Sequence, residues 1–135
     1  MASLKSSFPI TIKEIYLDSF GHMNNATYLT LMEEARWDLI TKRGYGIEKI
    51  KQTSLGPTIV EIKINFLREI KLHEEIIIET QMLSYEKKIG ILLQKMLRND
   101  EVCCTADFVI GLFDLKQRKL VLPTDDWLYA VGMKN

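Results

Sequence analysis

The sequence predicts an α+β domain in which one long helix is followed by a run of antiparallel strands. A helical pattern begins near residue 24 and ends near residue 43, and apolar–polar alternation fills most of the chain from 60 to 122. The helix is apolar over more than half of its circumference, so it must be largely enclosed. The economical arrangement wraps the sheet around the helix.

The first expected elements are a strand at 8–17 and the long helix. The strand alternates loosely between apolar and polar residues. Asn24 or Asn25 is the expected helix N-cap, and Gly44-Tyr45-Gly46 ends the helix. An apolar stripe at helical spacing, widened on both sides, is formed by Tyr28, Met32, Ala35 and Leu39, then Leu29, Leu31, Trp37 and Ile40.

Four strand-like runs follow the helix, at 60–66, 76–85, 89–98 and 102–115. The second and third are expected to form a hairpin that turns near Glu86-Lys87-Lys88, and Asn99-Asp100 makes the next turn. A short return at 120–122 precedes a stop at Pro123 and a terminal helical turn through Val131.

Length and charge agree with one domain over 1–135. The 18 basic and 18 acidic residues cancel, so no global field favours nucleic acid or an anionic membrane. No segment approaches the roughly 20 apolar residues of a membrane span. Cys103 and Cys104 are adjacent and are expected on opposite faces of a strand, which disfavours a disulfide. Two reduced cysteines and the absence of an apolar signal core predict the cytoplasm.

The junction between the first strand and the helix carries the reactive side chains. The acid Asp18, the imidazole His22 and the carboxamides Asn24 and Asn25 fall within eight positions. A helix N-terminus offers unpaired backbone N–H groups and a partial positive charge. Such a junction holds a developing oxyanion while Asp18 supplies a base or a negative charge. We therefore interpret it as an acyl-transfer site.

A thioester matches what this junction offers. Its leaving thiol has a pKa of about 8.5 and departs largely as thiolate, so strong acid assistance is unnecessary. Asp18 supplies the attacking oxygen, directly or by activating water. A backbone N–H near Asn25 stabilises the carbonyl oxyanion. For His22 three roles stay open: orienting Asp18, positioning water, or donating to the thioester.

The expected site comprises the catalytic candidates Asp18, His22 and Asn25 and the substrate-binding candidates Gly21, Asn24 and Tyr28, with no metal. Gly21 is expected mainly to serve a tight backbone conformation. Tyr28 is expected to face the core. On the helix, Glu33 and Arg36 are expected to form a surface ion pair.

Asp18-x-x-x-His22-x-Asn24-Asn25-x-x-Tyr28, continuing into Glu33-Glu34-Ala35-Arg36-Trp37-Asp38, resembles the signature of the hotdog-fold acyl-CoA thioesterases, the group related to 4-hydroxybenzoyl-CoA thioesterase. It is closest to the long-chain acyl-CoA thioesterase III type. It is also similar to the plant acyl-carrier-protein thioesterases, which share the acid–His–Asn-Asn pattern. The element order agrees along nearly the whole chain, and residue identity is dense from 16 to 38.

The resemblance implies a hotdog fold and hydrolysis of an acyl thioester, most simply fatty acyl-CoA, with coenzyme A entering as part of the substrate and no separate cofactor. Asp18 would act as base or nucleophile, and the helix N-terminus at Asn25 would polarise the carbonyl. An exposed sheet edge predicts pairing with a second copy, as a homodimer or homotetramer. The resemblance implies that the partner strand completes each site. An acyl-carrier-protein substrate and a non-catalytic acyl-thioester-binding module are the alternatives.

Coenzyme A carries phosphates, so basic residues are expected near the mouth of the site. Lys87, Lys88 and Arg98 flank the predicted hairpin and are the candidates. The sequence departs from its relatives nearby, since they usually have proline at the position of Ile70 and Gly-Asp in place of Glu74-Glu75.

Overall fold

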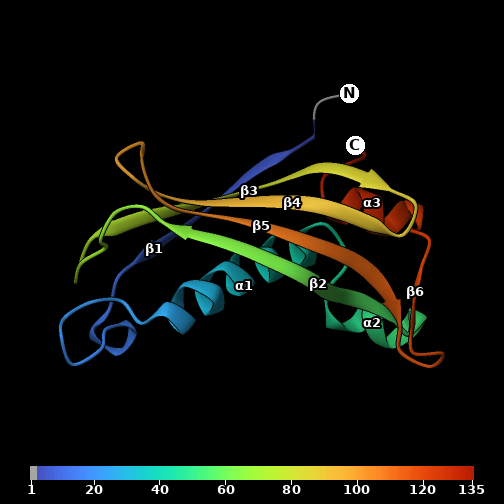
Figure 1. Cartoon of the computed structure of the whole chain (residues 1–135). Helices are drawn as coiled ribbons and strands as arrows, with labels where there is room; N and C mark the ends of the chain where they lie inside the picture. The colour runs from blue at the N-terminus through green and yellow to red at the C-terminus, as the bar shows by residue number, and fades with distance from the viewer. Residues whose placement is uncertain (1–2) are drawn as a thin grey trace.

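A long helix lies across one face of a six-stranded antiparallel sheet in the computed structural model, which describes residues 3–135 (Figure 1). The sheet order is β1-β3-β4-β5-β2, and β6 pairs with the end of β5. The strands are β1 (Lys5–Thr11), β2 (Leu55–Phe66), β3 (Glu75–Glu86), β4 (Ile89–Arg98), β5 (Glu101–Asp114) and β6 (Lys119–Val121). This α+β arrangement confirms the predicted fold class.

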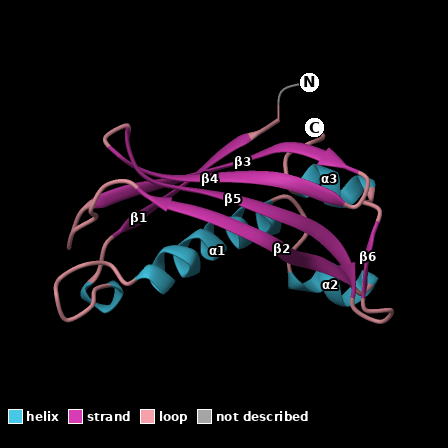
Figure 2. Cartoon of the chain, in the orientation of Figure 1, coloured by secondary structure: helices cyan, strands magenta, loops and turns pink. Residues whose placement is uncertain are grey.

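The long helix α1 (Asn25–Lys42) runs under the sheet, whereas two short helices lie near one end of it (Figure 2). These are α2 (Ile47–Thr53) and α3 (Asp125–Ala130). The α1 and α3 predictions are confirmed, with Asn24 and Thr124 as their N-caps. The sequence analysis did not predict α2, and it placed the start of β2 five residues too late.

The predicted first strand is wrong in its second half. β1 ends at Thr11, which is paired with Glu75, the first residue of β3. Ile12 still forms backbone hydrogen bonds with Glu74 and His73, which precede β3, and after Ile12 the chain leaves the sheet. Glu14–Tyr16 form a single 3-10 turn that leads toward α1.

The core lies between α1 and the inner face of the three central strands, whose buried residues alternate along the chain. Nearly all of these are apolar, but Thr80 and Gln94 are also buried and sit opposite each other in the β3–β4 ladder. Polar side chains in such a position need hydrogen-bond partners. The partners of Gln94 include two residues of α1, Met32 and Arg36.

The apolar stripe of α1 is buried as predicted, but the enclosure is incomplete on one side. Tyr28, Met32, Ala35 and Leu39 are all buried. Trp37, by contrast, keeps 36% of its surface exposed and lines a pocket together with the start of β2. At Trp37, α1 therefore still faces solvent beside the edge strand β2.

The two cysteines are both fully buried in the core, where a bulge breaks the regular alternation expected for them. Met96 pairs with Cys104, whereas the next residue of β4, Leu97, pairs with Val102. Cys103 is thus the extra residue on β5. Both thiols are free.

The buried thiols should be unreactive in the folded protein. Burial raises the pKa of Cys104 to about 12, and burial also raises the pKa of Cys103. Because the thiolate is the reactive form, Ellman's reagent at neutral pH should label neither thiol in the native protein and both in guanidinium. N-acetylcysteine is the control. Labelling of the native protein as fast as that of N-acetylcysteine would show that the thiols are accessible to solvent.

Candidate active site

The segment 17–24 forms a closed loop at the start of α1. Leu17 and Met23 make an isolated antiparallel bridge, and the Asp18 N–H donates to the His22 carbonyl at 2.7 Å. The Gly21 N–H donates to the Asp18 carbonyl at 3.1 Å. Gly21 has φ = +81°, a conformation that glycine adopts without steric cost. The expectation that Gly21 serves the backbone is confirmed.

Asp18 organises this loop through its side chain. Its Oδ1 accepts hydrogen bonds from the backbone N–H groups of Phe20, at 2.9 Å, and His22, at 3.1 Å. Its other oxygen, Oδ2, has no protein partner within residues 3–135. One oxygen is therefore committed to the loop, while the second is free for chemistry in an exposed position.

Asn24 and Asn25 start the helix in different ways. The Asn24 side-chain oxygen accepts from the Ala26 N–H at 2.8 Å, and its carbonyl accepts from the Thr27 N–H at 2.9 Å. Asn24 is therefore the N-cap. No described acceptor is found for the N–H of Asn25, the first helical residue. That N–H is the donor available to a ligand at the positive end of the helix.

A pocket of about 240 Å³ lies beside this helix start, between α1 and the end of β2. The loop and α1 contribute His22, Met23, Asn25 and Tyr28, and the other wall is Phe66, Leu67, Arg68 and Glu69. The sequence-predicted residues His22, Asn25 and Tyr28 thus come together. Asp18, Gly21 and Asn24 shape the loop that leads to the pocket and do not line it.

His22 contacts an acid that the sequence analysis missed. Its Nε2 lies 2.9 Å from Oε1 of Glu69, whereas only its backbone contacts the Asp18 carboxylate. The His22 side chain is more than half exposed and the Glu69 side chain is nearly half exposed, so this pair contributes little to the stability of the fold. Its consequence is geometric, because it fixes the imidazole at the rim of the pocket. No alternation or spacing marks Glu69, which lies in the loop after β2.

Tyr28 belongs both to the core and to the pocket wall. It is buried and meets Phe66 edge-to-face, with ring centroids 4.9 Å apart. Burial, and to a smaller extent the Cys104 and Cys103 thiols and Glu69, raise the pKa of Tyr28. The phenol therefore stays protonated at neutral pH and keeps a hydrogen atom to donate.

The three basic candidates for phosphate binding do not lie together. Lys87 and Lys88 line a depression at the β3–β4 turn. Arg98, at the far end of β4, is bound to Glu74 at 3.0 Å and to Glu101 at 2.6 Å, and these hydrogen bonds raise its pKa. Arg98 lines a hollow that shares Leu67, Arg68 and Glu69 with the pocket at the helix start.

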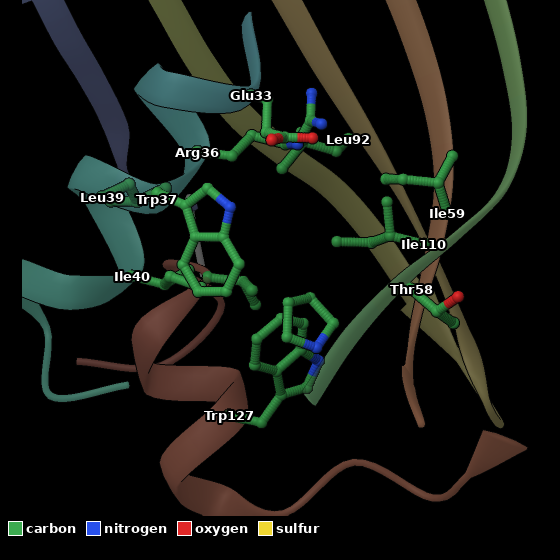
Figure 3. A pocket seen from close by; sticks show the side chains of 12 residues that line it. Glu33, Arg36, Trp37, Leu39, Ile40, Thr58, Ile59, Leu92, Ile110 and Trp127 are labelled. Carbon is green, nitrogen blue, oxygen red and sulfur yellow. The ribbon is translucent and has the colours of Figure 1, made fainter. Parts of the chain in front are cut away.

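A second pocket, of about 120 Å³, lies farther along α1 and opens beside the start of β2 (Figure 3). Its walls come from the second half of α1, from β2, β4 and β5, and from α3 with the residue after it. Within residues 3–135 no group of three His, Cys, Asp or Glu side chains is placed to hold a metal ion. In the same range, no helix is long and apolar enough to cross a membrane.

Comparison with known proteins gives consistent relatives. A family model described as the thioesterase-like superfamily matches residues 14–131. The long-chain acyl-CoA thioesterase FadM of Escherichia coli (strain K12) is 32% identical over 112 residues, which cover 82% of this chain and 84% of that protein.

Solved structures share the fold. The crystal structure of YbaW, described as a probable thioesterase of Escherichia coli, has a TM-score of 0.81 and 26% identity and covers 93% of this chain and 96% of that one. A Staphylococcus aureus protein in complex with CoA has a TM-score of 0.88 at 13% identity and covers 98% of this chain and 85% of that one.

Proposed function

The chain belongs to the thioesterase-like superfamily, and on that premise we propose that it hydrolyses acyl-CoA thioesters, with fatty acyl groups as its substrates. The observation that carries this proposal is the loop at 18–24, which begins at the Asp18 carboxylate, with one oxygen unpartnered, and leads to the unpaired N–H at the start of α1. The identity with a long-chain acyl-CoA thioesterase supports the fatty acyl class.

The reaction needs an attacking oxygen and a donor to the carbonyl. In the water route, Asp18 takes a proton from water as the water oxygen bonds to the acyl carbon, and the C–S bond then breaks to release CoA thiolate. In the covalent route, Asp18 itself bonds to the acyl carbon and expels the thiolate, and water then hydrolyses the resulting anhydride. In both routes the carbonyl oxygen accepts the Asn25 N–H.

The roles of the remaining site residues follow from their positions. Tyr28 and Met23 form the wall against which the thioester rests. His22, tethered to Glu69, donates or accepts a hydrogen bond at the rim, where a water molecule enters. Asn24 keeps the helix start in shape through its cap, and Gly21 keeps the loop closed.

A second copy of the chain is expected to cover the β2 edge. In β2, Ile62 and Phe66 share the face of their β5 partners Phe108 and Cys104, which are fully buried. Ile62 and Phe66 nevertheless keep 41% and 48% of their surfaces exposed. An apolar edge strand of this kind is a template for strand pairing. We infer a homodimer built on β2, in which each copy completes the site of the other.

The test is thiol release from a panel of acyl-CoAs, short to long plus one aromatic, with an acyl-carrier-protein thioester beside it. We expect turnover of the fatty acyl-CoAs, with activity rising toward longer chains. Faster turnover of the carrier-protein thioester would indicate that acyl-carrier-protein thioesters, and not acyl-CoAs, are the substrates. Binding without turnover on every substrate, by a folded protein, would overturn the hydrolase assignment.

A further inference from the structure

The second pocket has a guanidinium at one end of an otherwise apolar chamber. Arg36 comes from the middle of α1 and lines the pocket with Glu33, at the same end (Figure 3). The remaining walls are nearly all apolar, and consist of Trp37, Leu39, Ile40, Pro57, Thr58, Ile59, Leu92, Ile110, Trp127 and Val131.

Arg36 is held in place by neutral groups. Its Nη1 donates to Oε1 of Gln94 at 2.8 Å, and its guanidinium carbon lies 4.4 Å from the centre of the Phe108 ring. Gln94 in turn donates from Nε2 to the Met32 carbonyl, at 3.0 Å, and to the Thr80 hydroxyl, at 2.9 Å. Thr80, Gln94 and Arg36 therefore form a chain of hydrogen bonds that leads from the buried sheet to the pocket.

The guanidinium lacks an anionic partner. The expected ion pair with Glu33 is absent, because no carboxylate within residues 3–135 lies within 4.0 Å of Arg36. Glu33 is exposed and acts on Arg36 only through its field. Burial lowers the pKa of Arg36 to about 10, so the group is still cationic at neutral pH. Arg36 is half-buried, and a partly desolvated cation without a counterion carries a cost that a neutral side chain bonded to Gln94 would avoid.

We propose that this pocket binds a carboxylate carried on an apolar chain, with Arg36 as the residue that recognises the acid. The free donors of the guanidinium fork match the two carboxylate oxygens, and the apolar walls contact the carbon chain. The volume is close to that of cavities that hold a benzene-sized group. The pocket therefore takes the end of a ligand and leaves the rest of it outside.

Two sources supply this chemistry: a free fatty acid, or the far end of an acyl group that ends in a second carboxyl. The second source rests on the proposed function. Along α1, Arg36 lies eleven residues after Asn25, which is a rise of about 16 Å. Within one subunit only an elongated acyl group spans that distance. In an antiparallel β2–β2 dimer, the start of one β2 also approaches the end of the other.

Binding can be followed without turnover, because Trp37 and Trp127 line the pocket and are the two tryptophans of the chain. Tryptophan emission is titrated with decanoate and with decanol, which share the chain and differ in the acid. We expect decanoate to bind at least about tenfold more tightly, as one charge-assisted hydrogen bond would give. Arg36→Met should abolish the difference, and Arg36→Lys, which keeps the charge without the fork, should retain part of it.

The substrate arm compares dodecanoyl-CoA with the mono-CoA thioester of dodecanedioic acid. If the acyl end is the occupant, kcat/KM should favour the acid-ended substrate by about tenfold in wild type and not in Arg36→Met. Arginine-dependent decanoate binding without this preference would assign the pocket to a free acid. If the protein bound decanoate but hydrolysed no thioester, the proposed hydrolase function would be overturned and the proposed acid-binding pocket would stand.

The matched control is Arg118→Met, because Arg118 also stacks over a phenylalanine, Phe113, and lies outside the pocket. It should leave the acid preference unchanged. Thermal unfolding of each variant shows whether it folds. If Arg36→Met does not fold, the proposal is tested by Arg36→Lys and by the comparison of decanoate with decanol in the wild type. Equal binding of decanoate and decanol by wild type, with no preference in the substrate arm, would overturn the proposal.

Discussion

Asp18→Asn should lower kcat/KM for acyl-CoA by about two to four orders of magnitude while leaving the protein folded. Asparagine keeps an oxygen that can accept from the Phe20 and His22 N–H groups, so the loop retains its hydrogen bonds. What it loses is the charge and basicity of the second oxygen. Thiol release with saturating and limiting substrate measures the effect.

The control for this variant is Asp38→Asn. Asp38 lies on α1, pairs with Lys42 at 2.9 Å and lines neither pocket. It should keep wild-type activity. Asp18→Asn with more than about a tenth of the wild-type kcat/KM would remove Asp18 from the role of base or nucleophile, because that loss is smaller than a general base contributes.

Ile62→Lys should convert the proposed dimer to a monomer and remove most of the activity. In a two-fold interface each substitution occurs twice, so two lysines are brought toward one apolar surface. Burying unpaired like charges costs several kcal/mol, which is more than 100-fold in the dimer dissociation constant by an order-of-magnitude estimate. Sedimentation or size-exclusion chromatography with light scattering reports the mass, and thiol release reports the site.

The matched control is Ile77→Lys. Ile77 has nearly the same exposure, 38% against 41% for Ile62, but lies on β3, whose two neighbours in the sheet are β1 and β4. It should leave mass and activity unchanged. If Ile62→Lys remained dimeric, the copies would have to meet on another face. If it were monomeric and fully active, each subunit would contain a complete site.

The sequence predicted those elements that are governed by local periodicity and capping. The α1 boundaries follow from the Asn24 cap and the glycines after Arg43, and β4 was predicted at its observed bounds. Apart from the short helix α2, which was missed, the errors lie where the structure depends on distant partners. β1 ends where β3 begins, and the bulge at Cys103 depends on how β4 and β5 align. Neither partner is visible in the local pattern.

The candidate site was predicted in part for the same reason. The loop residues are contiguous in sequence, so their joint placement at the helix start could be predicted. Glu69 reaches His22 across forty-seven positions, and Arg36 reaches Gln94 across fifty-eight. Arg36 and Glu33 have the spacing of a surface ion pair, which is why the sequence favoured that pair. The structure shows that Arg36 instead turns inward to Gln94, which is buried on the inner face of the sheet.

Both pockets are built on one uninterrupted helix, and this fixes their relative orientation. Asn25 and Tyr28 line the first pocket, and Glu33, Arg36 and Ile40 line the second. At 100° per residue these positions fall within roughly half a turn of α1. Inserting a single residue between Tyr28 and Glu33 would rotate the second set by about 100° away from the first. A change in the length of α1 would therefore misalign the two pockets, whereas a change in the side chains of the walls would alter the size of the ligand that fits and keep that alignment.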